Sequence, residues 1–413
     1  MQILKAYKFR IYPTQEQQNS LSVQFGHSRF VYNRFIDNRK TTFLTTGKGV
    51  SFYDFKRQVT AMKQQPAFAW LKEADSQVLQ ASLEDADRAY QNFFRNHKDG
   101  TLPKPGRKPR KDGMPKGYPT FWSKHDDQSI RYPQRFKIEG SKLYLPKVGW
   151  VKIVLHRAME GKAKSCTVSK TKTGHYFASI QCEIEKDIQP TTNTQAVGID
   201  LGLKDFAILS SQDETTKIEP PKHLRKAESL LKIRQRRVSR KVKGSNSRNK
   251  ARLTVAATHE KVANRRKDFH HKLSRQIVDR FGSIGLETLN VKGMIQNHNL
   301  AKSIADAGWS QFANFVEYKA AWAGVEVVRH DRWFASSKTC NDCGYVNRNL
   351  KLSDRTWICP DCGVIHDRDE NAARNLIPTT AGAAGSNAVG NMTSAVRQSA
   401  PEKSQDLAQL TLF

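Results

Sequence analysis

The sequence predicts a mixed architecture in which an α/β domain is combined with an all-β module and a helical module. Short apolar segments that end in a carboxylate, such as AVGID at 196–200, are typical of strands in an α/β domain. Apolar residues three and four positions apart over 76–96 predict a helix, and short strand patterns fill 119–186. With 413 residues the chain is long enough for two to four domains with buried cores.

The charge of the chain indicates its partner. Lysine and arginine number 69 against 39 aspartates and glutamates, which gives a formal net charge of +30. Such an excess repels itself unless a polyanion neutralises it, so nucleic acid is the first expected partner. An anionic membrane is the competing partner, but the sequence has no long apolar run, amphipathic anchor or secretory signal. We therefore expect no membrane association and a cytoplasmic location.

The N-terminal region predicts one strand followed by helices. Residues 5–12 alternate apolar and cationic side chains, so one face of this strand would be apolar and the other cationic. Thr14 and Gln17 form a capping-box pattern that opens a helix to about residue 40, and a further helix fits 76–96. We expect the first strand to join the later β module, so that the helical module is an insertion.

The next region predicts a linker and then short strands. Residues 101–117 are dense in proline, glycine and cations, which predicts an extended basic linker that is either solvated or in contact with phosphates. Short strands are expected at Phe121, Lys142–Leu145 and Val151–Leu155, and in a hairpin over Cys166–Glu185. Lysine and aromatic side chains are interleaved along these strands, so the sequence predicts a small β-barrel with a basic face.

Residues 222–280 predict two basic helices joined by a loop at Gly244–Asn246. The expected core positions are Leu253, Val262, Phe269, Leu273 and Ile277, and the expected outward cations are Arg265, Arg266 and Lys267. A charged helix face is usually only solvated, but cations here outnumber acids too far for i,i+4 pairing, which favours a hairpin that faces phosphates. His270 and His271 are expected to be structural. A helix at 303–323 and a strand at Val325–Val328 follow.

Three separated acidic residues stand where an apolar strand ends or a helix begins. Asp200 ends the strand at 196–200, Glu287 ends an apolar run that starts at Phe281, and Asp369 lies at the entry to a helix. Each has a simpler interpretation, because Asp favours turns and caps the N-termini of helices. In an open α/β sheet, however, the residues of a functional site come together at the ends of the strands.

Carboxylates that gather in this way imply a divalent metal. Like charges within a few ångströms destabilise each other unless cations bind between them, and Mg²⁺ needs only oxygen ligands and water. Two Mg²⁺ ions held by Asp200, Glu287 and Asp369 could activate a water and stabilise the leaving oxygen of a phosphodiester. This is the chemistry of a nuclease or a transposase.

The cysteines predict a second metal. Two C-x2-C pairs, each followed by glycine and separated by fifteen residues, are formed by Cys340, Cys343, Cys359 and Cys362. This spacing predicts a structural Zn²⁺ site; two disulfides or free thiols are the alternatives, and a chain without a secretory signal disfavours disulfides. A closed four-thiolate site has no position for water, so the zinc would hold a loop. Cys166 and Cys182 are expected to be small buried hydrophobes.

Several of these segments together resemble a known family. GIDLGLKDFA, GLET and HDRDENAARNL, with the cysteine pairs between the last two, resemble the TnpB (OrfB) family of transposon-encoded RNA-guided nucleases, relatives of the type V CRISPR effectors. KAYKFRIYPT…RFVYNRFI and SKLYLPKVGWVKI are similar to the family as well, so the resemblance covers about residues 1–377. It implies a split RuvC domain of the RNase H fold, a zinc ribbon inserted before the last acidic motif, and an N-terminal wedge barrel interrupted by a helical recognition domain.

The resemblance also implies domain limits and residue roles. The limits are 1–13 and 119–194 for the wedge, 14–118 for the recognition domain, 195–335 and 366–377 for the RuvC-like domain, and 336–365 for the ribbon. Residues 378–413, small and polar, are expected to be a disordered tail. The family's catalytic acids fall on Asp200, Glu287 and Asp369, with Asp367 in a capping or supporting role, and its zinc ligands fall on the four ribbon cysteines.

The partners implied by the resemblance are a guide RNA derived from the transposon end and a target double-stranded DNA that is cut next to a short adjacent motif. Such a protein would work in the prokaryotic cytoplasm, at the nucleoid. Two alternatives share the same carboxylates or the same basic surface: an unguided transposase, and a non-catalytic nucleic-acid-binding regulator.

Overall fold

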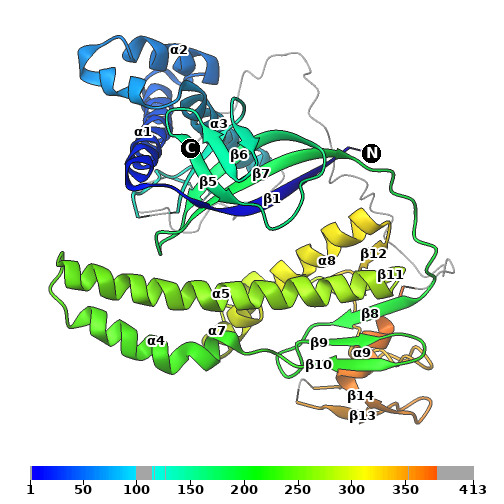
Figure 1. Ribbon diagram of the computed structural model, residues 1–413. Helices are drawn as coiled ribbons and strands as arrows, with labels where there is room; N and C mark the ends of the chain where they lie inside the picture. Colours follow the sequence, from blue (N-terminus) through cyan, green and yellow to red (C-terminus); the bar gives the residue numbers. More distant parts are fainter. Residues whose placement is uncertain (1, 99–113, 116, 126, 352, 379–413) are drawn as a thin grey trace.

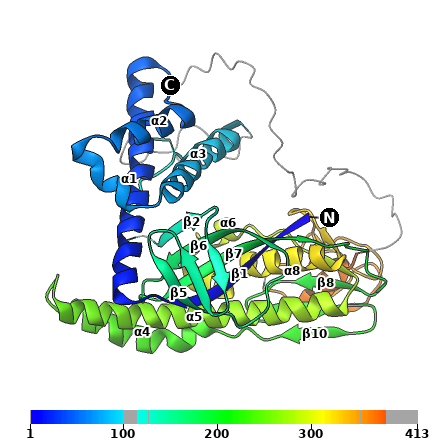
Figure 2. The ribbon, with the colours of Figure 1, turned by 45° about the horizontal axis from the view of Figure 1, so that its top comes forward.

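The computed structural model describes residues 2–98, 114–115, 117–125, 127–351 and 353–378. An N-terminal sheet with inserted helices lies beside a second sheet with its own helices (Figures 1 and 2). The expected basic linker at 101–117 and the expected tail at 378–413 fall almost entirely outside the described residues. In the part that is described, no helix is both long enough and apolar enough to cross a bilayer.

The N-terminal module is built on one seven-stranded antiparallel sheet. Its strands are β1 (Gln2–Tyr12), β2 (Gln128–Tyr132), β3 (Lys137–Glu139), β4 (Lys142–Leu145), β5 (Gly149–Val154), β6 (Lys162–Lys170) and β7 (Tyr176–Glu185). The spatial order is β2-β6-β7-β1-β5-β4-β3. Because β1 pairs with both β5 and β7, the N-terminal strand does join the later strands, and the helices between β1 and β2 are an insertion.

In place of the expected small β-barrel, the strands form one sheet whose order ends at β2 and β3, and no pairing between these two strands closes it among the described residues. The inserted helices pack on this sheet: Leu21, Phe25 and Val78 share one buried cluster with side chains of the strands. The expected strand at Phe121 is also wrong. The neighbouring Trp122 stacks on Tyr32 and its backbone N–H donates to the side chain of Asn33, so this segment lies against a helix rather than in the sheet.

The insertion contains α1 (Gln15–Thr46), α2 (Phe52–Met62), a 3-10 helix (Pro66–Glu73) and α3 (Ser76–Lys98). The predicted capping box is confirmed: the Thr14 hydroxyl accepts from the Gln17 N–H, and the Gln17 side chain accepts from the Thr14 N–H. A core of aromatic and aliphatic side chains, among them Phe35, Phe55 and Tyr90, joins the three helices.

The C-terminal module is built on a five-stranded sheet in the order β10-β9-β8-β11-β12. Its strands are β8 (Ala196–Asp200), β9 (Ala207–Ser210), β10 (Thr215–Ile218), β11 (Ser283–Leu286) and β12 (Glu326–Arg329). β11 is parallel to both β8 and β12, and Leu286 pairs with Ile199. The carboxyl ends of these three strands therefore meet at one edge, where Asp200 and Glu287 stand at adjacent positions.

The helices of this module are α4 (His223–Ser239), α5 (Asn246–Arg280), α6 (Val291–Met294), α7 (His298–Ala307) and α8 (Trp309–Ala323). α4 and α5 form the predicted hairpin, but its expected core and surface need two corrections. Leu253 is 48% exposed, because the first half of α5 extends beyond the sheet (Figure 1). Arg266 does not face outward; it donates to the Ala305 carbonyl and pairs with Asp306.

The single helix expected at 303–323 is in fact two helices. Gly308 adopts φ +66°, in the left-handed region, and it both ends α7 and begins α8. Glycine enters this region at little cost, so the chain changes direction there. His270 is buried beside this turn and hydrogen-bonds the Ala307 carbonyl and Gln311, which confirms the structural role expected for it.

The C-terminal end of the described chain is a short hairpin, β13 (Thr356–Ile358) and β14 (Ile365–Asp367), followed by α9 (Arg368–Asn375). α9 lies directly against strand backbone at two glycines. A Cβ atom at Gly198 in β8 would stand 2.0 Å from the Ala373 oxygen, and one at Gly285 in β11 would stand 1.7 Å from the Leu376 oxygen. Only glycine permits this approach.

Replacing Gly285 with alanine should therefore destabilise the C-terminal module. The added methyl meets a backbone oxygen that no side-chain rotation can move, so we expect a loss of about 2 kcal/mol or more in urea denaturation. The matched control is Gly26→Ala in α1, where a Cβ meets nothing within 4 Å and helix propensity should add about 0.5–1 kcal/mol. Equal stability of the two variants would contradict this packing.

Candidate active site and zinc ribbon

The three acids chosen from sequence lie at one edge of the C-terminal sheet. Asp200 is the last residue of β8, Glu287 directly follows β11, and Asp369 lies in the first turn of α9. The strand ends are joined by a hydrogen bond from the Leu201 N–H to Glu287 Oε1, at 3.3 Å. Arg329, at the end of β12, donates to the Glu287 carbonyl at 3.2 Å. Backbone contacts thus fix Glu287 beside Asp200.

Crowding of the carboxylates changes their acidity. Burial, and then the charges of Glu287 and Asp369, raise the pKa of Asp200 well above its usual range. Burial raises the pKa of Glu287 to about 7, opposed by the Leu201 N–H that favours its ionised form. Half-buried carboxylates that repel each other are an environment in which a bound cation is strongly stabilising. An all-oxygen donor set of this kind suits Mg²⁺.

Asp369 has a cationic neighbour that sequence reasoning did not single out. Arg355, from the ribbon just before β13, donates from Nη1 to both carboxylate oxygens of Asp369, at 3.2 and 3.3 Å. In addition, Arg368 is buried and lowers the pKa of Asp200 from the raised value set by the other acids. Nothing in the local sequence of Arg355 signals this contact, because it depends on how the ribbon folds back onto α9.

Asp367 has the supporting role expected for it. Its Oδ1 accepts from the backbone N–H groups of Asp369 and Glu370, at 3.0 and 3.1 Å, so it caps α9. Its Oδ2 pairs with Lys217 of β10 at 3.3 Å, and Lys217 also pairs with Glu370 at 2.7 Å. These contacts fix the first turn of α9, and with it Asp369.

The four ribbon cysteines come together as the sequence predicted. The sulfur atoms of Cys340, Cys343, Cys359 and Cys362 all lie within 4.8 Å of one another. Each knuckle closes through a glycine N–H, from Gly344 to the Cys340 carbonyl and from Gly363 to the Cys359 carbonyl, both at 2.9 Å. All six cysteines are free, so the disulfide alternative fails. Four sulfur donors in one cluster fit Zn²⁺ in a closed tetrahedral site.

Cys166 and Cys182, outside the ribbon, are 0% and 1% exposed within the N-terminal sheet, as expected for small hydrophobes. In the described part of the chain, one further set of donors lies within 4.8 Å, formed by Cys340, Asp342 and His366. His366 Nε2 stands 3.0 Å from Cys340 Sγ, so this buried ring holds β14 against the first knuckle.

Two asparagines attach the first knuckle to α9. Asn371 accepts from the Asn341 N–H at 3.0 Å and donates to the Thr339 carbonyl at 2.7 Å. Asn375, one turn later, donates to the same Thr339 carbonyl at 2.7 Å. These residues were not singled out from sequence, although their i,i+4 spacing on the helix after the ribbon is a usable signal. The ribbon and the candidate active site therefore share one helix.

The fold of the chain resembles that of one solved nuclease complex. The structure is similar to that of a Cas12f1 in complex with sgRNA and target DNA, with a TM-score of 0.55 at 13% identity, over 91% of this chain and 98% of that one. At this identity the likeness shows the fold.

Sequence comparisons identify the family. Residues 179–298 match the OrfB_IS605 model, described as a probable transposase, 309–376 match the TNB domain of Cas12f1-like proteins, and 1–48 match a helix-turn-helix domain of OrfB_IS605 proteins. A "Putative RNA-guided DNA endonuclease" of Streptomyces pristinaespiralis is 37% identical over 91% of this chain and 89% of its own length. InsQ of Escherichia coli K12, with the same description, is 29% identical over 91% of this chain and 92% of its length. The chain belongs to the OrfB (TnpB) family.

Removing two ribbon cysteines should release zinc and loosen α9. We expect the unaltered protein to contain about one zinc per chain by elemental analysis, and Cys340→Ser/Cys343→Ser to contain none. Backbone amides of α9 should then exchange faster with deuterium, because the Thr339 and Asn341 contacts of Asn371 are lost. Cys182→Ala is the control and should keep its zinc. Unaltered protein without zinc would refute the ribbon assignment.

The raised pKa of Glu287 predicts how stability depends on pH. The folded state keeps a proton up to about pH 7, whereas the unfolded state loses it near the ordinary value of 4.5. Without added Mg²⁺, the free energy of unfolding should therefore fall as pH rises from 5 to 8, by on the order of 3 kcal/mol from this group. Glu287→Gln should reduce this fall. Urea denaturation that shows the same fall in both proteins would exclude the effect.

Proposed function

We propose that the chain is an RNA-guided, Mg²⁺-dependent DNA endonuclease with a RuvC-like active site of Asp200, Glu287 and Asp369. The observation that carries the proposal is that Asp200, Glu287 and Asp369 come from separate segments and meet at the carboxyl edge of the sheet, where the charges of the other two act on the half-buried Asp200. Isolated turns or caps do not explain why three carboxylates from separate segments meet at one edge of the sheet. A metal site does.

The residues of the chain have distinct roles in this proposal. When bound, two Mg²⁺ ions supply an activated water and stabilise the oxygen that leaves the phosphodiester. The charges of both Glu287 and Asp369 act on Asp200, which suits a shared ligand. The Leu201 N–H and Arg329 hold Glu287 in place, and the Asp367 cap holds Asp369. Arg355 brings a positive charge to the same edge, where phosphate oxygens would lie.

A metal-bound site must also accommodate its substrate. A cavity of about 220 Å³ opens beside Glu287, and Trp309, Asn314 and Arg329 are among the residues that line it. A strand of DNA would reach the acids from this side of the sheet. Because the net charge of the chain is +30, the protein as a whole attracts the phosphate backbone over a distance set by ionic strength.

We further propose that a transposon-derived guide RNA selects the double-stranded target by base pairing, beside a short adjacent motif, and that the protein recognises backbone and duplex shape. In this proposal the seven-stranded sheet is the wedge, the α1–α3 insertion is the recognition domain, and the C-terminal sheet is the split RuvC domain around the ribbon. The substrate would be nucleoid DNA. Relatives described as RNA-guided DNA endonucleases support the guide.

An unguided transposase is the second candidate, favoured by the description of the family model as a probable transposase. It would use the same carboxylates but would yield joined DNA products, whereas the guided nuclease yields cleaved ends only. A non-catalytic regulator would bind nucleic acid without metal-dependent cutting. Sequencing RNA that co-purifies with the chain separates the guided from the unguided candidates.

Replacing Asp200 or Asp369 with alanine should abolish cleavage while leaving RNA binding intact. Loss of a central metal ligand should lower the rate by roughly 10³-fold or more, because the acids act as one unit. Cleavage of a guide-matched plasmid in Mg²⁺ measures this, and a gel-shift assay with the guide measures binding. The control is Asp279→Asn, an exposed acid paired with Arg275 at the end of α5. Cleavage by the alanine variants at the unaltered rate would refute the site.

A further inference from the structure

The buried histidine of the ribbon, His366, contacts one of the four cysteines directly. It lies in β14, just before the turn of α9 that carries Asp369, and it is 4% exposed. Its Nε2 stands 3.0 Å from Cys340 Sγ and 3.7 Å from the Asp342 carboxylate. The set of close donors that these three residues form includes none of the other ribbon cysteines, so the ring lies outside the four sulfurs.

The distance to the sulfur distinguishes a hydrogen bond from a shared metal ligand. In a tetrahedral zinc site, two sulfur ligands lie about 3.8 Å apart, and a sulfur and a nitrogen ligand lie about 3.5 Å apart. Two pairs of ribbon sulfurs lie 3.7 and 3.5 Å apart, Cys340 with Cys362 and Cys343 with Cys359. These separations fit ligands of one ion. The 3.0 Å between His366 and Cys340 is shorter and fits a direct N–H···S contact.

The direction of this hydrogen bond follows from the chemistry of a zinc ligand. A cysteine that binds zinc is a thiolate, so its sulfur has no hydrogen and can only accept. His366 Nε2 therefore carries the hydrogen and donates it to Cys340. Trp357, the partner of His366 across the hairpin, packs on the ring with centroids 4.8 Å apart and keeps it in this orientation. A buried N–H needs an acceptor, and here the acceptor is sulfur.

The other three sulfurs accept hydrogen bonds from the backbone. The donors are the N–H groups of Tyr345 for Cys343, of Asp361 and Cys362 for Cys359, and of Val364 for Cys362. These donors belong to the knuckle turns themselves. The donor from His366 is a side chain, so one substitution can remove it and leave the backbone of both knuckles unchanged.

Cys340 is also the cysteine whose neighbours attach α9. Thr339 and Asn341, on either side of it, hydrogen-bond Asn371 of α9 at 2.7 and 3.0 Å. If Cys340 left the metal, both neighbours would lose their fixed position. A donor that stabilises this one thiolate therefore acts on the helix that carries Asp369.

From these observations we infer that His366 is a positioning residue of the zinc site, which donates from Nε2 to the Cys340 thiolate and thereby raises the affinity of the ribbon for zinc. Four thiolates around one Zn²⁺ leave an excess of negative charge, and a hydrogen bond to a charged acceptor is about twice as strong as one between neutral groups. The inference concerns the zinc site alone and does not depend on the proposed nuclease activity.

Two substitutions separate the hydrogen bond from the packing of the ring. His366→Phe keeps a ring against Trp357 but has no donor, whereas His366→Gln keeps an N–H at the end of its side chain but loses the ring. Zinc affinity is measured by competition with a chromophoric chelator. It should fall about 10–100-fold in His366→Phe, the usual effect of removing a partner of a metal ligand, and stay close to that of the unaltered protein in His366→Gln.

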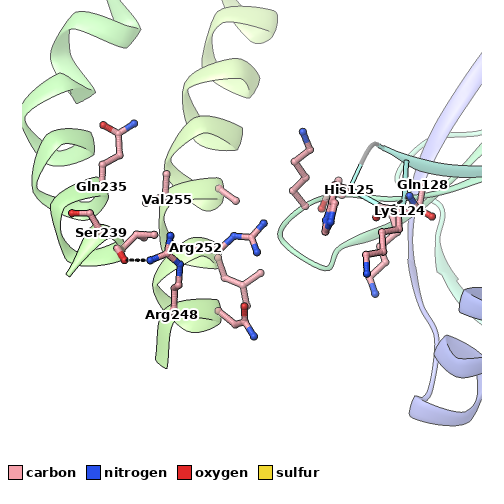
Figure 3. A pocket seen from close by; sticks show the side chains of 15 residues that line it. Lys124, His125, Gln128, Gln235, Ser239, Arg248, Arg252 and Val255 are labelled. Atoms are coloured by element: carbon pink, nitrogen blue, oxygen red, sulfur yellow. Dashed lines mark hydrogen bonds between the residues drawn. The ribbon is translucent and has the colours of Figure 1, made fainter. Parts of the chain in front are cut away.

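The matched control is His125→Phe, which should leave the zinc affinity unchanged. His125 is an exposed histidine of the N-terminal module, where it lines a groove of about 720 Å³ that faces the α4–α5 hairpin (Figure 3). Unchanged zinc affinity in His366→Phe would overturn the inference, because the donor would then contribute nothing. An equal loss in His366→Phe and His366→Gln would overturn it as well, because packing would then account for the effect.

A second measurement uses the unaltered protein and holds even where a variant fails to fold. In zinc-loaded protein with isotopically labelled histidine, NMR should show a proton on the Nε2 of His366, whose signal is identified by its proximity to the Trp357 ring. An Nε2 without a proton, as in a metal-bound nitrogen or an acceptor, would overturn the inference. Neither measurement requires cleavage, so failure of the proposed nuclease activity would be seen separately.

Discussion

The structure around the acids depends on the close packing of α9 against the backbones of β8 and β11. Gly198 and Gly285 leave no side chain between helix and strands, so the helix that carries Asp369 comes within reach of Asp200 and Glu287. A side chain of ordinary size at either position would separate the last acid from the first two. The position of the three acids thus depends on the absence of side chains at Gly198 and Gly285 as much as on the acids themselves.

The ribbon acts on the same helix from its other side. Asn371 and Asn375 hold the first cysteine knuckle, Arg355 reaches Asp369, and His366 links the knuckle to β14. A zinc ion that takes no part in chemistry would in this way set the position of a residue that does. Packing from the sheet and hydrogen bonds from the ribbon together leave α9 little freedom to move.

Sequence reasoning recovered what local pattern determines and missed what tertiary packing determines. The strand at Lys142–Leu145, the Thr14–Gln17 cap and the four-cysteine cluster follow from alternation, capping chemistry and ligand spacing, and the structure contains all three. The break at Gly308 was missed because apolar periodicity continues across it. Leu253 was misplaced because the pattern shows that a helix has an apolar face but not how far the sheet beneath it extends. The role of Arg355 could not be found from sequence, because its contact with Asp369 depends on tertiary folding and not on a fixed spacing along the chain.

The position of β1 in the middle of its sheet has a consequence for synthesis on the ribosome. Gln2 pairs with Glu185, so both edges of β1, the first strand synthesised, are paired only after β7 has been synthesised. At about 5–20 residues per second, the delay is roughly 10–35 s. During this time Tyr7, Phe9 and Ile11 have no sheet to cover them, while α1–α3, whose contacts are local, can already fold. The nascent chain would thus present a finished helical unit joined to an unpaired, half-apolar strand.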